Sequence, residues 1–377
     1  MLVVIGQYGE LHKREFEKAR DSKKRLCIHV PSKSGISFVT RLLSKPNKIV
    51  KLVLHNVALE TNLRLHKAFL GPHCNVTIIS GITDTTANVV FEHMRQADSK
   101  IKHLLNIKLS DVNVKHVLSN TDIQTLLFFS SSWQSRHDPR IDPSTEQLFL
   151  EHLEHSKITK FSIKYPSSLL MEAIIRSKIT DLSVIMPSEY DDALSFCEQL
   201  GRSKVTCLSL TLDGEFAPWI TGLDVNKLTT LRLEVSSRPY WKEPHTDINL
   251  MILPLLQRAS SHVHTLDMGN FPLDKPTCCA LANMTCEPTT TLRHLHLDSV
   301  NTEFIGTISV SSCQIKSVTL PPRPQYNRDR KLIQLNIKKR MRIQARYTLA
   351  SSQYRVGIMS DLHQLPMEII RHIATML

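Results

Sequence analysis

The sequence has no long apolar run, and this absence limits the classes of protein to which it can belong. The chain has 377 residues, of which 41% are hydrophobic and 22% charged. No stretch approaches the roughly 18 uninterrupted apolar residues of a membrane-spanning helix. The opening residues MLVVI form a short apolar start with no basic residues before it, unlike a secretory signal peptide. We therefore expect a cytoplasmic or nuclear protein without a membrane partner.

Motifs for metal, phosphate and nucleophilic chemistry are also missing. The eight cysteines are scattered and contain no CxxC pair, which favours reduced, packed thiols over a disulfide framework or a zinc site. The segment VPSKSGISF around Ser34 lacks the spacing of a phosphate-binding loop. No serine or cysteine lies in a recognisable nucleophile elbow. We expect no enzyme, no catalytic residue, no bound metal and no cofactor.

Two clusters contain metal-ligating residue types but fit other interpretations better. His152 and His155 in EHLEHSK would share a helix face beside two glutamates, which is more typical of a solvated outer helix than of a metal site. Cys278, Cys279 and Cys286 in PTCCALANMTCEP have no fourth ligand nearby. Small apolar side chains packed between structural units explain these cysteines better than a metal does.

The positive charge is confined to one segment. The formal net charge is +12, and the window from Arg323 to Arg355 holds ten basic residues against the single acid Asp329. Apolar residues interleave with these cations, so we expect part of the window to form an amphipathic helix that caps the fold. The basic patch within it could instead serve nuclear import or contact phosphate groups. That patch consists of Lys338, Lys339, Arg340 and Arg342.

The strongest signal is an internal repeat. Each copy has an apolar residue, two other residues, and then an apolar-x-apolar triplet. The copies are SKITKFSI from Ser156, SKITDLSV from Ser177, SKVTCLSL from Ser203, NKLTTLRL from Asn226, SHVHTLDM from Ser261, TTLRHLHL from Thr290 and CQIKSVTL from Cys313, with weaker copies NKIVKLVL from Asn47, LLNIKL from Leu104 and DIQTLLFF from Asp122. Successive strong copies lie 21 to 35 residues apart. Insertions on one side of a solenoid produce such irregular spacing.

Each repeat predicts a strand, a turn and a helix. In KITDLSVIMPSEYDDALSFCEQLGRS, the alternating Leu182 and Val184 indicate a strand. Apolar residues then recur at helical spacing over 193–200, and Gly201 is the expected C-terminal stop of that helix. One such unit cannot bury its own apolar side, so neighbouring units must stack, with parallel strands in one layer and helices in another.

These repeats resemble the leucine-rich-repeat family, whose core is written L-x-x-L-x-L, over residues 45–320. The family's asparagine, three residues after the last core leucine, is replaced by Pro166, Pro187, Asp213 and Val300. The resemblance implies an α/β solenoid of the irregular, long-repeat type, with strands on the concave face and helices outside. Its coils must then be held by something other than an asparagine ladder. An ordinary α/β domain is the alternative.

The C-terminal segment SDLHQLPMEIIRHIATML predicts an amphipathic helix, because its apolar residues recur at intervals of three and four. The arrangement L-P-x-E-I-I-x-x-I-x-x-x-L resembles the first helix of an F-box, the module that binds the Skp adaptor of cullin-RING ubiquitin ligases. An F-box has three helices, and the sequence ends after the first. The residues that would contact the adaptor are Leu365, Pro366, Ile369, Ile370 and Ile373. A SOCS box is a weaker match, since Asn336 and Met367 replace its cysteine and second proline.

The sequence therefore predicts four parts: an irregular N-terminal segment (1–44), the solenoid (45–320), a basic connector or cap (321–360) and an F-box-like helix (361–377). We expect a protein-interaction module that binds a protein substrate on the solenoid and the Skp adaptor through the final helix. One alternative is a plain repeat scaffold whose final helix only caps the solenoid. The other, which we favour least because aromatic residues are few, is a nuclear nucleic-acid binder that uses 323–355.

Overall fold

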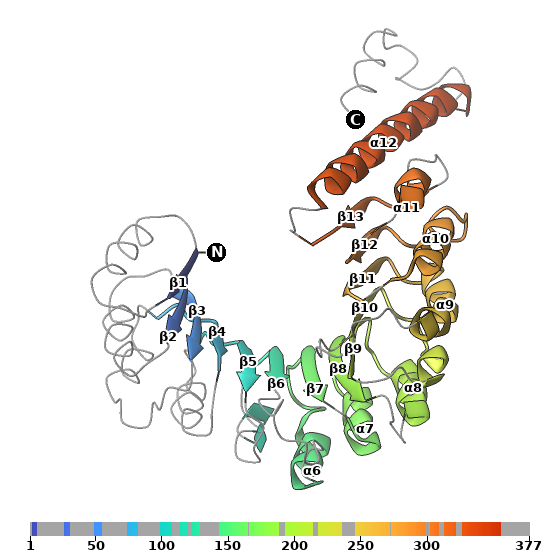
Figure 1. The fold of residues 1–377 in the computed structure, drawn as a ribbon. Helices are drawn as coiled ribbons and strands as arrows, with labels where there is room; N and C mark the ends of the chain where they lie inside the picture. The colour runs from blue at the N-terminus through green and yellow to red at the C-terminus, as the bar shows by residue number, and fades with distance from the viewer. Residues whose placement is uncertain are drawn as a thin grey trace. The chain divides into compact units, whose positions relative to one another are not determined.

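The computed structural model shows an α/β protein in which parallel strands alternate along the chain with helices (Figure 1). It describes residues 2–5, 26–30, 49–54, 74–81, 99–107, 114–115, 117–118, 122–128, 143–164, 166–187, 193–213, 218–235, 246–271, 273–298, 300, 302–308, 313–321 and 326–355. The chain divides into two compact units, the first made of 1–186 with 198–205 and the second of 187–197 with 206–377.

The strands of the first unit pair in chain order, and every pair is parallel. They are β1 (Leu2–Ile5), β2 (Leu26–Val30), β3 (Ile49–Leu54), β4 (Ile78–Ser80), β5 (His103–Ile107), β6 (Thr125–Phe128), β7 (Lys160–Lys164) and β8 (Asp181–Pro187). The sheet thus begins at Leu2, within the segment that the sequence left irregular. The repeat pattern misses β2 because Arg25 stands where the repeats have their first apolar residue, three positions before the strand residue Ile28 that pairs with Leu52.

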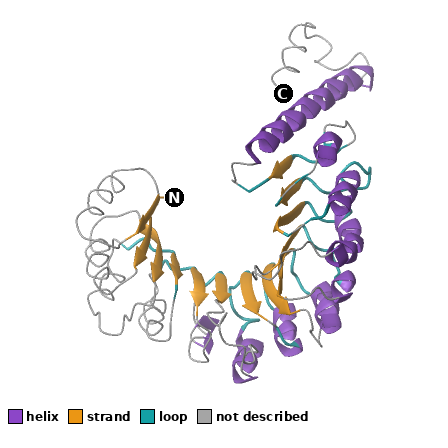
Figure 2. Ribbon diagram, viewed as in Figure 1, coloured by secondary structure: helices purple, strands orange, loops and turns teal. Residues whose placement is uncertain are grey.

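Helices lie on one side of the last strands of this sheet (Figure 2). The described helices here are α6 (Pro143–His152), α7 (Ser168–Arg176) and α8 (Ala193–Arg202), of which α8 has residues in both units. Figure 2 shows α6 and α7 on the same side of the strands. Phe149 of α6 and Phe161 of β7 are fully buried and meet edge to face, with ring centroids 5.5 Å apart. Aromatic pairs of this geometry add about 0.5–1.5 kcal/mol beyond the burial of their area.

The second unit repeats the arrangement. Its strands β9 (Cys207–Asp213), β10 (Thr230–Val235), β11 (Thr265–Asn270), β12 (His294–Leu297) and β13 (Ser317–Thr319) pair in chain order and are parallel. The helical segments η1 (Pro218–Gly222), α9 (Thr246–Ser260), α10 (Lys275–Met284) and α11 (Thr302–Thr307) lie on one side of them (Figure 2). After β9 the chain forms the short 3-10 segment η1, where the repeat pattern predicts an α-helix.

All ten sequence copies of the repeat contain a strand, namely β3 and β5 to β13. Leu182 and Val184 in β8 are fully buried, as the alternation predicts. The prediction that Gly201 stops the following helix is wrong, because α8 continues to Arg202. Ser203 ends it instead, since its backbone N–H and its hydroxyl both donate to the carbonyl of Leu200, at 3.0 Å and 2.7 Å.

A buried hydroxyl at the start of the repeat joins the end of one helix to the next strand. The Ser177 hydroxyl donates to the carbonyl of Ile174 at 2.7 Å and accepts from the N–H of Ile179 at 3.2 Å. Ser156 and Ser203 make the same two bonds in their own repeats. One side chain thereby satisfies the end of a helix and the entry into the next strand, both of which would otherwise leave buried backbone groups without partners.

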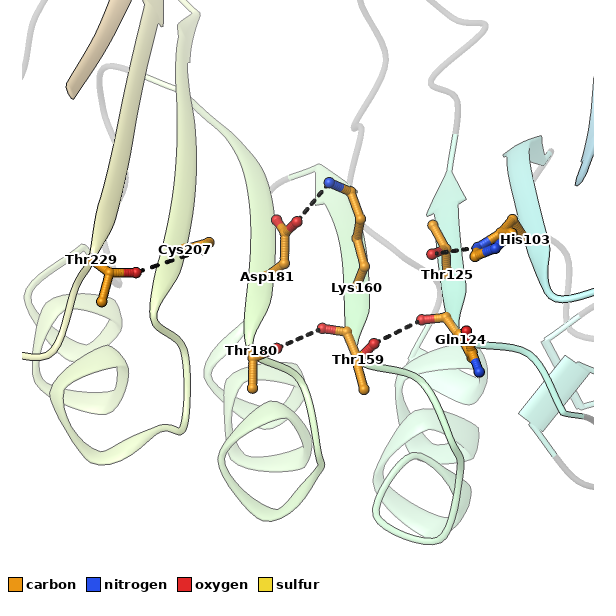
Figure 3. Close-up of polar contacts among 9 residues, drawn as sticks. All are labelled: His103, Gln124, Thr125, Thr159, Lys160, Thr180, Asp181, Cys207 and Thr229. Carbon is orange, nitrogen blue, oxygen red and sulfur yellow. Dashed lines mark hydrogen bonds and ion pairs between the residues drawn. The ribbon is translucent and has the colours of Figure 1, made fainter. Parts of the chain in front are cut away.

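The threonine and lysine of S-K-[IV]-T connect successive coils. The Thr159 hydroxyl donates to the carbonyl of Gln124 at 3.4 Å, and the Thr180 hydroxyl donates to the carbonyl of Thr159 at 3.5 Å (Figure 3). Lys204 reaches back with its ammonium group to the carbonyl of Ser177 at 3.0 Å. The threonine and lysine that recur in the repeat therefore form hydrogen bonds from side chain to backbone, in addition to the apolar contacts of the core.

The basic window forms one long helix, α12 (Asn327–Arg355), which packs against β13 and α11. Its inner face buries Ile333, Ile337 and Arg340, which share one side of the helix at spacings of four and three. Arg340 donates to the carbonyl of Ile308 at 2.9 Å and also to the carbonyl of Ile315. These contacts attach α12 to the last coil of the second unit.

Candidate functional site

Polar and charged side chains gather on the side of the second unit's strands that faces away from its helices. Side chains alternate between the two sides of a strand. In β10, Leu231 and Leu233 are fully buried on the helix side, whereas Arg232 between them is exposed. The strand register brings Arg232 beside Asp267 of β11, and Asp267 beside His296 of β12. The open sheet face, as we name this surface, consists of Arg232, Glu234, Asp267, Gly269, His294 and His296.

Asp267 is the centre of this surface. One of its carboxylate oxygens, Oδ2, accepts from Nε of Arg232 at 2.7 Å. The other, Oδ1, lies 2.8 Å from Nδ1 of His296 and accepts the backbone N–H of Gly269 at 3.1 Å. The Asp267 side chain is only 13% exposed, whereas those of Arg232 and His296 are 50% and 40% exposed. A largely buried carboxylate therefore holds two large side chains in fixed positions at the surface.

The carboxylate also selects the tautomer of His296. An ionised carboxylate can only accept hydrogen bonds, so the imidazole carries its proton on Nδ1 when it is neutral. Nε2 then becomes the acceptor of the ring. The pair Arg232 and His296 thus combines guanidinium donors with an imidazole acceptor, an arrangement that suits directed hydrogen bonds to a bound partner.

Gly269 allows the imidazole to lie against the backbone of β11. A Cβ atom at this position would come within 2.6 Å of Cε1 and 2.8 Å of Nε2 of the His296 ring. Any other residue would push the ring away. The glycine is therefore needed for the position of His296, not for an unusual turn of the chain.

Further polar groups flank this cluster on both sides. Glu234 places Oε1 3.9 Å from Nε of Arg232. On the other side, Nδ1 of His294 lies 2.8 Å from the Ser317 hydroxyl. In the part of the chain that the structure describes, no group of three or more His, Cys, Asp or Glu side chains could hold a metal ion. The surface can form several hydrogen bonds and ion pairs with a bound molecule.

The corresponding strands of the first unit carry smaller side chains. In β7 and β8 the equivalent positions are Ser162 and Ser183, which lie side by side in the register. One ion pair joins the two strands, with Nζ of Lys160 2.6 Å from Oδ2 of Asp181 (Figure 3).

His103 of β5 is partly buried in the sheet beside a neighbouring lysine, and both affect its pKa. Its Nδ1 lies 3.0 Å from the Thr125 hydroxyl of β6 (Figure 3). Partial burial lowers the pKa of His103 below its usual value, and the charge of Lys102 lowers it further.

The structure describes only one of the two sites that the sequence singles out. The adaptor-binding residues Leu365, Pro366, Ile369, Ile370 and Ile373 lie outside the described residues. In the basic patch, Lys338, Lys339 and Arg342 are exposed on α12, whereas Arg340 is only 3% exposed. Arg340 does not belong to the surface, because it falls on the same helix side as Ile333 and Ile337.

The two histidines considered as metal ligands do not share a helix. His152 ends α6 and lies 3.9 Å from a carboxylate oxygen of Glu151, and the exposed His155 lies in the turn that follows. Among the cysteines, Cys278 is buried, while Cys279 and Cys286 are partly exposed. None of the three forms a disulfide bond.

Sequence reasoning missed the open sheet face, although a signal for it was present. Arg232, Asp267 and His296 are the middle residues of the triplets LRL, LDM and LHL. The other strong copies of the repeat carry serine or threonine at this position, as in FSI, LSV, LSL and VTL, so the large charged side chains of LRL, LDM and LHL mark the exposed side of the sheet.

Comparison with known proteins adds no family. No protein-family model matches this chain, and no curated protein sequence matches it either. Among the helices that the structure describes, none is both long and apolar enough to cross a membrane.

Proposed function

We propose that this chain is a protein-interaction module that binds a partner protein on the open sheet face. The observation that carries the proposal is the arrangement around Asp267, which holds Arg232 and His296 in place before any partner arrives. Groups that are already ordered lose less conformational entropy on binding. Arginine is also among the side chains that most often dominate the energy of protein interfaces.

The finer assignment of the fold, to the leucine-rich repeats, is part of this proposal. Its support is the coincidence of the ten L-x-x-L-x-L-like copies with ten parallel strands. The hydroxyl contacts of Ser156, Ser177 and Ser203 supply a means of holding the coil without the family's asparagine. Repeat arrays of this kind commonly present an extended sheet surface to macromolecules.

We further propose that the module selects substrates for a cullin-RING ubiquitin ligase. The support for this step is the F-box-like sequence Leu365 to Leu377 alone. Burying three or four aliphatic side chains at about 1.5–3 kcal/mol each would give several kcal/mol before the costs of association. In the alternative, these residues seal the repeats, and the protein is a scaffold without an adaptor.

The interaction proposal is tested by isolating partners on the immobilised chain and titrating each purified partner against variants. Arg232→Ala and His296→Ala should each weaken binding by about tenfold. Lys178→Ala, at an exposed position of the first unit, should leave binding unchanged. Equal affinity for all three variants would remove the open sheet face from the interaction.

The ligase proposal needs a separate experiment. Purified Skp adaptor is mixed with the intact chain and with an Ile369→Asp, Ile370→Asp variant whose thermal melt matches that of the wild type. Binding by the intact chain alone supports adaptor docking. If neither protein binds, the scaffold alternative holds, and the proposal for the open sheet face is unaffected.

A further inference from the structure

The outward face of α12 is a basic surface separate from the open sheet face. At 3.6 residues per turn, the side of the helix opposite Ile333, Ile337 and Arg340 contains the positions 328, 331, 335, 338, 339 and 342. Five of these six are Lys or Arg, and all five are exposed: Arg328, Lys331, Lys338, Lys339 and Arg342. The stripe is about 21 Å long at 1.5 Å per residue.

No opposite charge from its own helix neutralises this stripe. The only acidic residue of α12 is Asp329, which lies towards the inner face and is partly buried. Cations spaced in this way along one side of a helix create a positive potential that attracts an anionic partner. A partner with several negative groups would therefore complement the charge of the stripe.

Two leucines interrupt the cations. Leu335 is 62% exposed and lies in the middle of the stripe, and Leu332, one turn away at i−3, is 40% exposed. Side chains at this spacing are neighbours on a helix surface. Together they form a small apolar site with cations on both sides, and this combination restricts the kind of anion that fits.

A nucleic-acid backbone complements the charge but not the leucines. Phosphates offer no apolar group for Leu335, and the described side chains of α12, from 327 to 345, include no aromatic ring on which a base could stack. A lipid surface is a poor match for a different reason. Helices that lie on membranes present a broad apolar face to the lipid, whereas the apolar face of α12 is buried against β13 and α11.

We propose that the outward face of α12 binds an acidic amphipathic helix of a partner protein. Aliphatic side chains of that helix contact Leu332 and Leu335, and its flanking carboxylates pair with Arg328, Lys331, Lys338, Lys339 and Arg342. The contact is independent of the open sheet face. The module would therefore have two surfaces, one on its strands and one on its terminal helix.

The test uses a synthetic helical peptide with two leucines at i and i+3 flanked by glutamates. Its control is a peptide of the same composition with the leucines on opposite faces. Binding of each labelled peptide to the full chain is measured by fluorescence anisotropy at low and high salt. A short DNA duplex and phosphatidylserine-containing vesicles are the competing probes.

Three variants separate charge from apolar contact. The first variant combines the three changes Lys338→Glu, Lys339→Glu and Arg342→Glu, and the second carries the single change Leu335→Ser. Each of these two variants should bind the peptide about tenfold or more weakly than the wild type does. The triple change Lys102→Glu, Lys178→Glu, Arg202→Glu has the same net charge but alters exposed sites of the first unit, and it should leave binding close to that of the wild type.

The expected result is tighter binding of the amphipathic peptide than of its control, with sensitivity to both kinds of change in α12. The proposal is overturned if the peptide does not bind, or if DNA or vesicles bind more tightly than it does. It is also overturned if Leu335→Ser has no effect, because the surface would then attract polyanions through charge alone. None of these outcomes depends on partner binding by Arg232 or His296.

Discussion

The strands β7 and β8 of the first unit and the strands β10 to β12 of the second use the same repeat for different surfaces. The middle residue of the apolar-x-apolar triplet is Ser162 or Ser183 in the first set. It is Arg232, Asp267 or His296 in the second, where the three side chains form one linked cluster. The flanking apolar residues are buried in both sets. The difference shows that the repeat leaves its triplet middle free to vary without disturbing the core.

The hydroxyl contacts that hold the coils are alike in the two units, although the triplet middles differ. In the first unit the Ser177 hydroxyl donates to the carbonyl of Ile174, three residues earlier. In the second unit the Ser260 hydroxyl donates to the carbonyl of Gln257 in the same way, at 2.7 Å. Stability should therefore depend on the hydroxyls and the core in both units, whereas partner binding should depend on the triplet middles of the second.

The largest expected effect is that of Arg340→Ala. This change removes the hydrogen bonds to the carbonyls of Ile308 and Ile315 and leaves a cavity beneath α12. It should lower the free energy of unfolding by about 2–4 kcal/mol. Arg342→Ala, at an exposed position two residues later, should change it by less than about 0.5 kcal/mol. Urea unfolding of the two variants measures the difference, and equal effects would contradict the buried position of Arg340.

A smaller effect is expected for Ser177→Ala. The hydroxyl is fully buried, and its removal takes one hydrogen-bond partner from the carbonyl of Ile174 and one from the N–H of Ile179. We expect a loss of about 1–2 kcal/mol in the free energy of unfolding. Ser183→Ala removes the same hydroxyl from the triplet middle and should cost less than about 0.5 kcal/mol. Similar costs in denaturant titrations would mean that the two serines share one role.

Gly269→Ala should change the site more than the stability. The added methyl group displaces the His296 ring from Asp267, because the two cannot occupy the same space. The free energy of unfolding should change by about 1 kcal/mol or less. Nitrogen-15 NMR of the imidazole should show the neutral ring protonated on Nδ1 in the wild type and a mixture of tautomers in the variant. An unchanged ring spectrum would show that Gly269 does not control the position of His296.

The smallest expected effect is a pH dependence from His103. Because its pKa is lowered in the folded state, the unfolded chain binds more protons as the pH falls below the ordinary histidine pKa of about 6.5. Stability should therefore decrease from about pH 6.5 downward until the folded-state pKa is passed. His103→Gln should reduce this slope in denaturant titrations at several pH values. A steeper dependence of the free energy of unfolding on pH in the variant would contradict the lowered pKa of His103 in the folded state.

The sequence predicted the elements whose signal is local and missed what depends on register. Leu182 and Val184 alternate within one strand, so their burial could be predicted. Ser203, not Gly201, ends α8 because a hydroxyl contact outweighs the usual preference for glycine. The open sheet face could not be predicted as a cluster, since Arg232 and Asp267 are 35 residues apart and meet only through strand pairing.

The basic window shows a second limit of sequence reasoning. Apolar residues interleaved with the cations predict a helix in part of the window, and α12 is one. The number of cations in the window does not say which of them face the rest of the protein. Arg340 was therefore grouped with Lys338 and Lys339, although packing against α11 and β13 buries it.

The central claim is that a partner protein binds the strand side of the second unit and not its helix side. A photo-crosslinking amino acid at Thr230, at the start of β10, tests it against the same residue at Gln257, an exposed position of α9. The account predicts a crosslinked partner from Thr230, lost in the Arg232→Ala background, and none from Gln257. A partner captured from Gln257 but not from Thr230 would contradict it.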